Sequence, residues 1–192
     1  YSGAADRTLA TTLWYPLDSE ESHPLVIHSH GFTSARNDLS YVAELLASHG
    51  YVVAAADYPL THGGAPGKPN AVDVVNQPAD VSFLIDSVSA LSGSEKPFSG
   101  SIDASRIGLM GYSLSGLTTE LATYPPTLRD PRVEAAASIA GPTAGFTADF
   151  CKTSDIPFLM IAGSLDYLIN FEANAATIPN LVENGALVTI AG

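Results

Sequence analysis

The sequence predicts an α/β protein with a mostly parallel sheet and helices on both faces. Two observations lead to this prediction. Short runs that are apolar throughout recur along the chain, and segments with helical spacing of apolar residues separate them. Strands that are apolar throughout are typical of parallel sheets, because both faces of such a sheet are buried. The connections between these runs are too short for a separate lid domain, so we expect one domain over residues 1–192 with an open site.

The composition favours a globular enzyme or binding protein over several other classes. Hydrophobic residues make up 46% and charged residues 15% of the 192 residues, which argues against disorder. The net charge of −12 argues against a nucleic-acid or anionic-membrane partner. No apolar run approaches the roughly 20 residues of a membrane span, so no stable membrane insertion is expected. The single cysteine, Cys151, cannot form an internal disulfide and is expected to be a small buried residue.

The N-terminal half is expected to begin with an edge strand. Residues Thr8 to Tyr15 alternate and carry β-formers, and Pro16 ends the run. The other elements expected in this half are a strand at Leu25–Ser29, a helix from Asn37 that stops at Gly50, a strand at Tyr51–Ala56, a Gly/Pro-rich loop at 60–72 and a helix that Pro78 opens and whose apolar face ends at Leu91.

The C-terminal half continues the same alternation. The elements expected there are a connection at Gly93–Ser105, strands at Ile107–Met110, Val133–Ala140, Pro157–Ala162 and Leu187–Ile190, a helix from Leu114 that Pro125 stops, a loop at Gly141–Asp155, and a helix from about Phe171 to near Pro179. These elements place a turn with a serine at its tip directly between a strand and a helix.

That turn, Gly111-Tyr112-Ser113-Leu114-Ser115-Gly116, predicts a nucleophilic serine. A strand, a sharp turn and a helix are the context of a nucleophile elbow, which holds the serine hydroxyl clear of the sheet. Ser113 fits the Gly-x-Ser frame, although Ser115 occupies the last glycine position and Gly116 follows one residue later. Ser115 could itself be proposed as the nucleophile, but its frame would need glycines where Ser113 and Leu117 stand.

Two further segments are expected beside Ser113, because ligands bind at the carboxyl ends of the strands in such sheets. His30-Gly31-Phe32 follows an earlier strand, and we expect the backbone N–H of Phe32 there to form an oxyanion hole with that of Leu114. Asp166 follows a later strand, at the position of an acid that orients a histidine.

The histidine of this arrangement is expected outside the given chain. In this fold the order is serine, acid, histidine, yet all five histidines (His23, His28, His30, His49 and His62) precede Ser113. The chain starts at Tyr1 without Met and stops at Gly192 directly after an apolar run. We therefore expect a domain that is incomplete at both ends, with the catalytic histidine in the loop beyond Gly192.

Three alternative interpretations compete with these assignments. His62-Gly63-Gly64 is similar to a lipase oxyanion motif but follows the wrong strand, so a loop turn is favoured. His28 and His30 share a strand face but lack a third ligand nearby, so no metal is expected. Asp57 also follows a strand and could compete with Asp166 as the acid, although a loop-anchoring carboxylate is the favoured interpretation.

Several stretches resemble those of α/β-hydrolases, and within them the dienelactone-hydrolase and platelet-activating-factor-acetylhydrolase-like esterases of bacteria. The stretches are Pro24–Ser34, Asp73–Phe83, Arg106–Gly116 and Ile161–Asp166. The resemblance implies an α/β-hydrolase fold and a serine ester hydrolase with Ser113 as nucleophile, Asp166 as acid, and Phe32 and Leu114 as oxyanion donors. It implies a small-molecule ester substrate, no cofactor, and a soluble bacterial protein that is either cytoplasmic or secreted. True dienelactone hydrolases use cysteine as the nucleophile, so the serine favours the esterase branch.

Two other functions remain open at this point. A non-catalytic relative could act as a binding or interaction protein, and a serine peptidase would share the same constellation. A peptidase commonly carries an added domain that gates substrate access, for which the sequence leaves no room.

Overall fold

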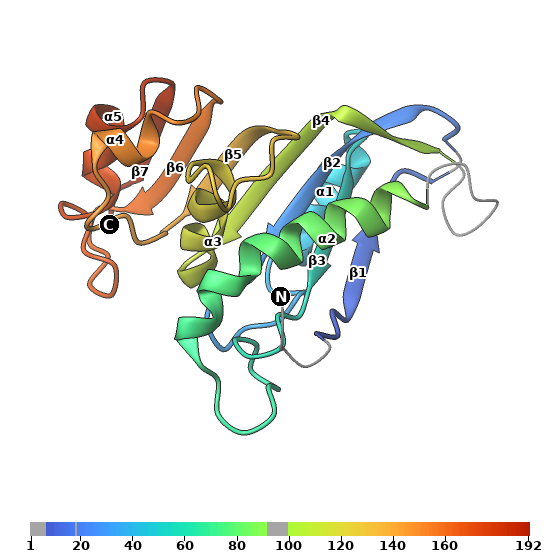
Figure 1. Ribbon diagram of the computed structural model, residues 1–192, viewed down its shortest axis with the longest axis horizontal. Coiled ribbons are helices and arrows are strands. Elements are labelled where there is room, and N and C mark those ends of the chain that lie inside the picture. Colours follow the sequence, from blue (N-terminus) through green and yellow to red (C-terminus); the bar gives the residue numbers. More distant parts are fainter. Residues whose placement is uncertain (1–6, 18, 92–99) are drawn as a thin grey trace.

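The strands form one seven-stranded sheet in the order β1-β3-β2-β4-β5-β6-β7 (Figure 1). The computed structural model describes residues 7–17, 19–91 and 100–192. The strands are β1 (Thr11–Trp14), β2 (Ser22–Ser29), β3 (Val52–Ala56), β4 (Ser101–Tyr112), β5 (Val133–Ile139), β6 (Phe158–Gly163) and β7 (Gly185–Ile190). Only β1 is antiparallel to its neighbour, and the other pairs are parallel. The mostly parallel sheet predicted from the apolar runs, with an edge strand at its start, is confirmed.

The helices lie on both faces of this sheet. They are α1 (Ser40–Ser48), α2 (Gln77–Ser89), α3 (Leu114–Thr123), α4 (Ala148–Cys151) and α5 (Ile178–Leu181), with two 3₁₀ segments, η1 (Ala71–Asn76) and η2 (Ala175–Thr177). Figure 1 shows α2 and α3 in front of the sheet and α1 behind it. None of them, within the described residues, has the length and apolar character that crossing a membrane requires.

The direction of each crossover explains this placement. From β3 onward every parallel connection steps the same way across the sheet, so right-handed crossovers put α2 and α3 on one face. The connection from β2 to β3 steps the opposite way, which puts α1 on the other face. The main core lies between the sheet and α2, whose side chains Val81, Leu84, Ile85 and Val88 are buried as their spacing predicted.

The face that carries α1 is less fully covered. An apolar groove of about 620 Å³ runs beside α1, between Leu46 and the strands that follow. Val26, Gly108, Ala137 and Leu159 belong to its lining and come from four neighbouring strands. This groove lies on the face of the sheet that carries α1. Its lining includes none of the predicted site residues, which are Phe32, Ser113, Leu114 and Asp166.

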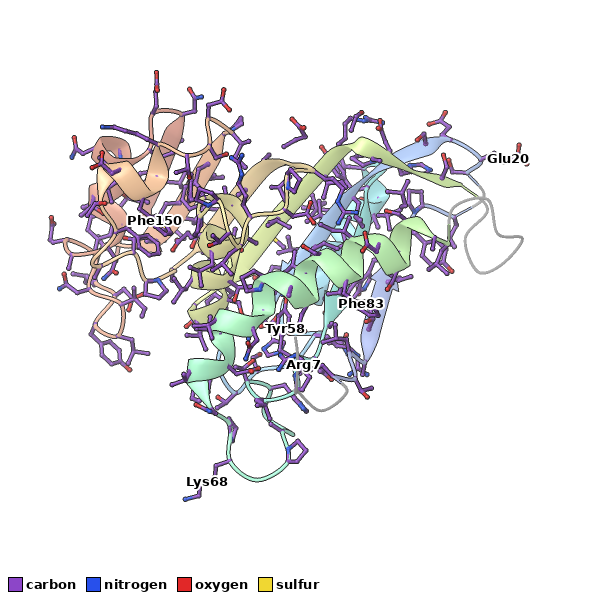
Figure 2. The ribbon with its side chains drawn as sticks, viewed as in Figure 1. Arg7, Glu20, Tyr58, Lys68, Phe83 and Phe150 are labelled. Carbon is purple, nitrogen blue, oxygen red and sulfur yellow. The ribbon has the colours of Figure 1, made fainter. Side chains whose placement is uncertain are left out.

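Ionic contacts anchor the start of the described chain to η1 and α2. The guanidinium of Arg7 donates to the carboxylate of Asp73 and to that of Asp80, at N–O distances of 2.6 to 2.9 Å. Figure 2 shows Arg7 and Tyr58 near one another at the lower end of the sheet, and Lys68 near the tip of a loop that projects away from it. This projecting loop is the Gly/Pro-rich segment expected at 60–72, although η1 begins at Ala71.

Several predicted boundaries were wrong, for local reasons. The helix expected from Asn37 begins at Ser40, because turns occupy the preceding residues. The elbow strand begins at Ser101, where pairing with Ser22 extends it beyond the apolar run. Of the connection expected at Gly93–Ser105, residues 92–99 lie outside the described residues.

The C-terminal connections also differ from their prediction. The loop expected at 141–155 contains α4, whose start is capped by the Thr147 hydroxyl accepting from Phe150 N at 3.3 Å. In place of the helix expected from Phe171, turns lead into η2 and α5. Pro179 lies in the first turn of α5, where its missing N–H costs nothing, so it starts this helix instead of ending one.

Candidate active site

Ser113 lies at a sharp turn between β4 and α3. Its backbone has φ 52° and ψ −123°, in a region that non-glycine residues rarely occupy. The Ser113 N–H donates to Ile139 O at 2.8 Å, and the Gly116 N–H donates to Ser113 O at 2.8 Å. Such a conformation costs about 1–3 kcal/mol and persists only where the surroundings impose it. The sharp turn expected at this serine is present, and its backbone is strained.

The glycines on either side of Ser113 allow strand and helix to approach. A Cβ at Gly111 would lie 1.9 Å from Ser115 O, and a Cβ at Gly116 would lie 2.4 Å from the Cα of Gly141. Neither position can hold a side chain without movement of the backbone. Gly116 stands one residue after the usual position of the second glycine. It is therefore the glycine that contacts Gly141 in the loop after β5.

Ser115 is turned into the protein. Its side chain is 1% exposed, and its hydroxyl donates to Gln77 Oε1 at 3.3 Å. A serine whose hydroxyl is enclosed in this way cannot meet a substrate. This supports Ser113 over Ser115 as the nucleophile.

The segment that carries Phe32 touches the elbow. A Cβ at Gly31 would lie 2.9 Å from the ring of Tyr112 and 3.4 Å from the Cβ of Ser113. Phe32 follows directly and is 40% exposed. Thr33 has φ 63°, which is unusual for a β-branched residue, and its N–H donates to Thr61 O at 2.8 Å.

His30 fixes the peptide group between Gly31 and Phe32. Its Nε2 accepts from the backbone N–H of Tyr58 at 3.1 Å, so its Nδ1 carries the proton and donates to Gly31 O at 2.7 Å. The Ser34 N–H also donates to Gly31 O, at 3.0 Å. Burial lowers the pKa of His30, which keeps the ring neutral. Because the peptide is trans, holding the Gly31 carbonyl also fixes the opposite direction of the Phe32 N–H.

Asp166 lies in an exposed loop three residues after β6. Its Oδ1 accepts from the backbone N–H groups of Leu168 and Ile169, both at 2.9 Å. Leu165, Tyr167 and Leu168 around it are 73%, 88% and 77% exposed. In the described part of the chain, no hydrogen bond joins Asp166 to Ser113 or to a histidine.

The sheet brings the three predicted segments to one edge. Ser29 pairs with Gly111, and Tyr112 pairs with Ile139, so β2, β4 and β5 end at the same level. Ile139 in turn pairs with Ile161 of β6, which runs parallel. The Phe32 segment lies beside Ser113, whereas Asp166 follows a strand two positions along the sheet.

The five histidines hold other positions. Their ring contacts are His23 with Gly50 O and Ser19 Oγ, His28 with Asp38, His30 with Gly31 O and Tyr58 N, His49 with Leu45 O and Ser48 Oγ, and His62 with Gly64 N. None of these contacts involves Ser113 or Asp166. No group of three His, Cys, Asp or Glu side chains with metal-site spacing occurs among residues 7–17, 19–91 and 100–192.

The competing residues anchor loops. Asp57 accepts from the backbone N of Arg36 at 2.7 Å and from its guanidinium, which ties down the segment after Phe32. Gly63 of the His62-Gly63-Gly64 string donates to Ser34 O at 2.8 Å. Both contacts support the loop interpretations favoured from the sequence.

Sequence reasoning missed three residues at this edge. Thr33 and Ala140 have positive φ angles, as Ser113 does, and both lie in loops after strands of the sheet. Neither residue type signals such a conformation, so no local pattern could have found them. Gln77 is the third, because its importance depends on contacts with segments far away in the sequence.

Comparison with known proteins agrees with this geometry. A family model described as PETase, PET hydrolase-like, matches residues 4–187. Cutinase est2 of Thermobifida alba is 31% identical over 119 residues, which are 62% of this chain and 36% of that protein. Cutinase 2 of Thermobifida cellulosilytica is 28% identical over 119 residues, which are 62% of this chain and 41% of that protein. The match therefore spans well under half the length of these relatives.

A solved structure shares the fold. The acylaminoacyl peptidase of Pyrococcus horikoshii superposes with a TM-score of 0.72 at 17% identity, covering 95% of this chain and 34% of that one. At this identity the likeness concerns the fold alone. It establishes the seven-stranded sheet with its helices as an α/β-hydrolase fold.

Proposed function

This chain belongs to the PET hydrolase-like family of α/β-hydrolases, and from that premise we propose that it is a serine carboxylic-ester hydrolase that acts through an acyl-enzyme. The observation that carries the proposal is the strained turn at Ser113, with φ 52°, against which the Gly31–Phe32 segment packs. A nucleophile at a sharp turn beside a fixed backbone N–H is the arrangement that acyl transfer needs.

Each group has a role in the proposed reaction. Ser113 Oγ attacks the ester carbonyl while a histidine takes its proton. The N–H groups of Leu114 and Phe32 stabilise the negative charge that develops on the carbonyl oxygen. Asp166 orients the histidine, which gives the proton to the alcohol as the bond between the carbonyl carbon and the alcohol oxygen breaks. Water, deprotonated by the same histidine, then attacks the acyl-enzyme, and the proton returns to Ser113 Oγ as the acid leaves.

The histidine is proposed to follow Gly192 in the native protein. Two observations support this. Within residues 7–17, 19–91 and 100–192 the ring contacts named above for the five histidines do not include Ser113 or Asp166, and the matched relatives are more than twice as long as the matched region. The proposed domain is thus one α/β-hydrolase domain that residues 1–192 make up only in part.

The substrate is proposed to be a small-molecule ester with an apolar acyl or alcohol group. Phe32 and Tyr112 beside Ser113 are 40% and 39% exposed, and Leu165 and Tyr167 flank Asp166. The serine nucleophile and the matching stretches also favour the esterase branch near dienelactone-hydrolase-like and platelet-activating-factor-acetylhydrolase-like proteins. Two of the relatives reported above are named as cutinases, which supports an ester as the substrate.

The test compares the 192-residue chain with the chain extended through its next native loop, on a short-chain nitrophenyl ester. We expect the extended chain to be active and its Ser113→Ala variant to fall to roughly 10³–10⁴-fold over water, because the oxyanion hole remains. Ser115→Ala tests the competing serine and should lose far less activity than Ser113→Ala, about tenfold at most, because it removes a contact to Gln77 and leaves the nucleophile in place. If the 192-residue chain turns over as fast as the extended one and depends on Ser113, a resident histidine is the base. If Ser113→Ala leaves hydrolysis unchanged, the proposed nucleophile is wrong.

A further inference from the structure

We propose that Gln77 is a positioning residue that links α3 to the Phe32 segment and thereby sets the distance between the two N–H groups of the oxyanion hole. The inference rests on the proposed function, because it concerns the two donors assigned there. Gln77 is the first residue of α2 and is 0% exposed. Its amide lies between two segments that are distant from it in the sequence.

The first half of the link joins Gln77 to α3. Gln77 Oε1 accepts from the hydroxyl of Thr118 and, at 3.3 Å, from that of Ser115. Thr118 is 0% and Ser115 is 1% exposed, so these bonds lie in a low-dielectric interior. A glycine at position 115 would have no hydroxyl for this contact. The serine in the usual glycine position therefore gives the residue next to Leu114 a direct tie to α2.

The second half joins Gln77 to the Phe32 segment. Gln77 Nε2 donates to Thr61 Oγ1 at 2.9 Å, and Thr61 is 1% exposed. The carbonyl of Thr61 accepts from Thr33 N at 2.8 Å. Close packing accompanies this bond, since a Cβ at Gly63 would lie 2.5 Å from Thr33 O. A shift of Thr61 must therefore move the residue next to Phe32.

Together these contacts form a continuous path between the two oxyanion donors. It runs from the residue after Leu114 through Gln77 and Thr61 to the residue after Phe32. One donor, Leu114, begins α3 and the other, Phe32, lies in the loop after β2, and stabilisation of the oxyanion requires both at 2.7–3.1 Å from one point. The buried amide of Gln77 bonds α3 directly and reaches the Phe32 segment through Thr61, which fixes the relative position of the two donors before substrate binds.

The test uses substitutions that remove the link and keep the volume. Gln77→Met keeps a long side chain without hydrogen bonds, and Thr118→Val removes one donor to Gln77. Thr123→Val is the matched control on the same helix: Thr123 is 2% exposed, and its hydroxyl donates at 2.7 Å to the helix carbonyl of Thr119 alone. All three variants are made in the chain extended through its next native loop, which is the form proposed to hydrolyse esters.

Two readouts separate positioning from mere stability. We expect Gln77→Met and Thr118→Val to lower kcat roughly tenfold with KM unchanged, because displacing a donor costs less than the 10²–10³-fold loss on deleting one. They should also speed amide hydrogen exchange at Thr33, which can be measured in the 192-residue chain without activity. Thr123→Val should change neither quantity, although it lowers the melting temperature to a similar extent.

The outcomes distinguish this inference from the proposed function. If Gln77→Met and Thr118→Val change only the melting temperature, as Thr123→Val does, the link is structural and the inference is overturned. Should Gln77→Met fail to fold, Thr118→Val against Thr123→Val decides. If instead Ser113→Ala retains full hydrolysis, the proposed function fails, while faster exchange at Thr33 would still establish the physical link.

Discussion

The two halves of the candidate site are built in different ways. Around Ser113, contacts join segments that are far apart in the sequence: Ser113 N bonds to Ile139 O, and Gly31 packs against the elbow. Around Asp166 the contacts are local, since its carboxylate accepts from backbone groups two and three residues later. The nucleophile half is thus held by the whole sheet, and the acid half is held by its own loop.

This difference shows which half of the site needs exact atomic positions. An oxyanion hole must match a reacting atom to within a fraction of an ångström, so its donors need long-range support. An acid that orients a histidine acts through that histidine and can be carried by a loop. We therefore expect substitutions in the nucleophile half to affect stability and activity together. Substitutions in the acid half should lower activity and leave stability nearly unchanged.

The largest expected effect is on activity at Asp166. In the extended chain, Asp166→Asn should lower kcat about 10⁴-fold, because an amide cannot stabilise the imidazolium. Its melting temperature should change little, since an amide oxygen can still accept from Leu168 and Ile169. Asp57→Asn is the matched control: it should lower the melting temperature, because it weakens the bonds to Arg36, and should lower kcat far less than Asp166→Asn does. Loss of hydrolysis in Asp57→Asn alone would make Asp57 the acid.

The next effect compares two glycines. Gly116→Ala should cost about 3 kcal/mol or more in the free energy of unfolding, because the new Cβ would lie 2.4 Å from the Cα of Gly141. Gly163→Ala, at the end of β6, should stay within about 1 kcal/mol of the parent, because nothing lies within 4 Å of that Cβ. Urea unfolding of the 192-residue chain measures both. Equal costs would contradict the contrast between the halves.

A pH effect is expected behind the elbow, at Glu120 of α3. Glu120 is 1% exposed, and burial raises its pKa well above the usual range. Since the unfolded side chain ionises near pH 4.3, stability is fully present below that pH and is lost at about 1.4 kcal/mol per pH unit until the folded group also ionises. Glu120→Gln should flatten this profile, so that the variant becomes the more stable protein as pH rises. The exposed Glu134→Gln serves as control, and a parental slope in Glu120→Gln would refute the assignment.

The smallest effect is expected at Thr33, whose φ is 63°. Thr33→Asn should raise the free energy of unfolding by about 1 kcal/mol, because asparagine tolerates the left-handed region better than a β-branched residue. Thr11→Asn in strand β1 is the control and should lower stability slightly, since asparagine is a poor strand former. A destabilised Thr33→Asn would mean that the threonine contacts outweigh the backbone strain.

The sequence by itself determined the parallel sheet, the strand–turn–helix at Ser113, and the edge that Phe32 and Asp166 share with it. These features follow from apolar periodicity, from glycines next to a serine and from the rule that ligands bind at the carboxyl ends of strands, all of which are local or topological. The helix expected from Phe171 was wrong because a weak apolar period there was outweighed by turns, with Pro179 opening α5.

Only the tertiary structure decided which side chains hold the site in place. Ser115 departs from the usual motif, and only the fold shows that its hydroxyl donates to Gln77 Oε1. The positive φ angles of Thr33 and Ala140 are likewise imposed by packing against other strands and loops. The physical reason is that a buried hydrogen bond between distant segments depends on where the whole fold places both partners, and no pattern within either segment records that position.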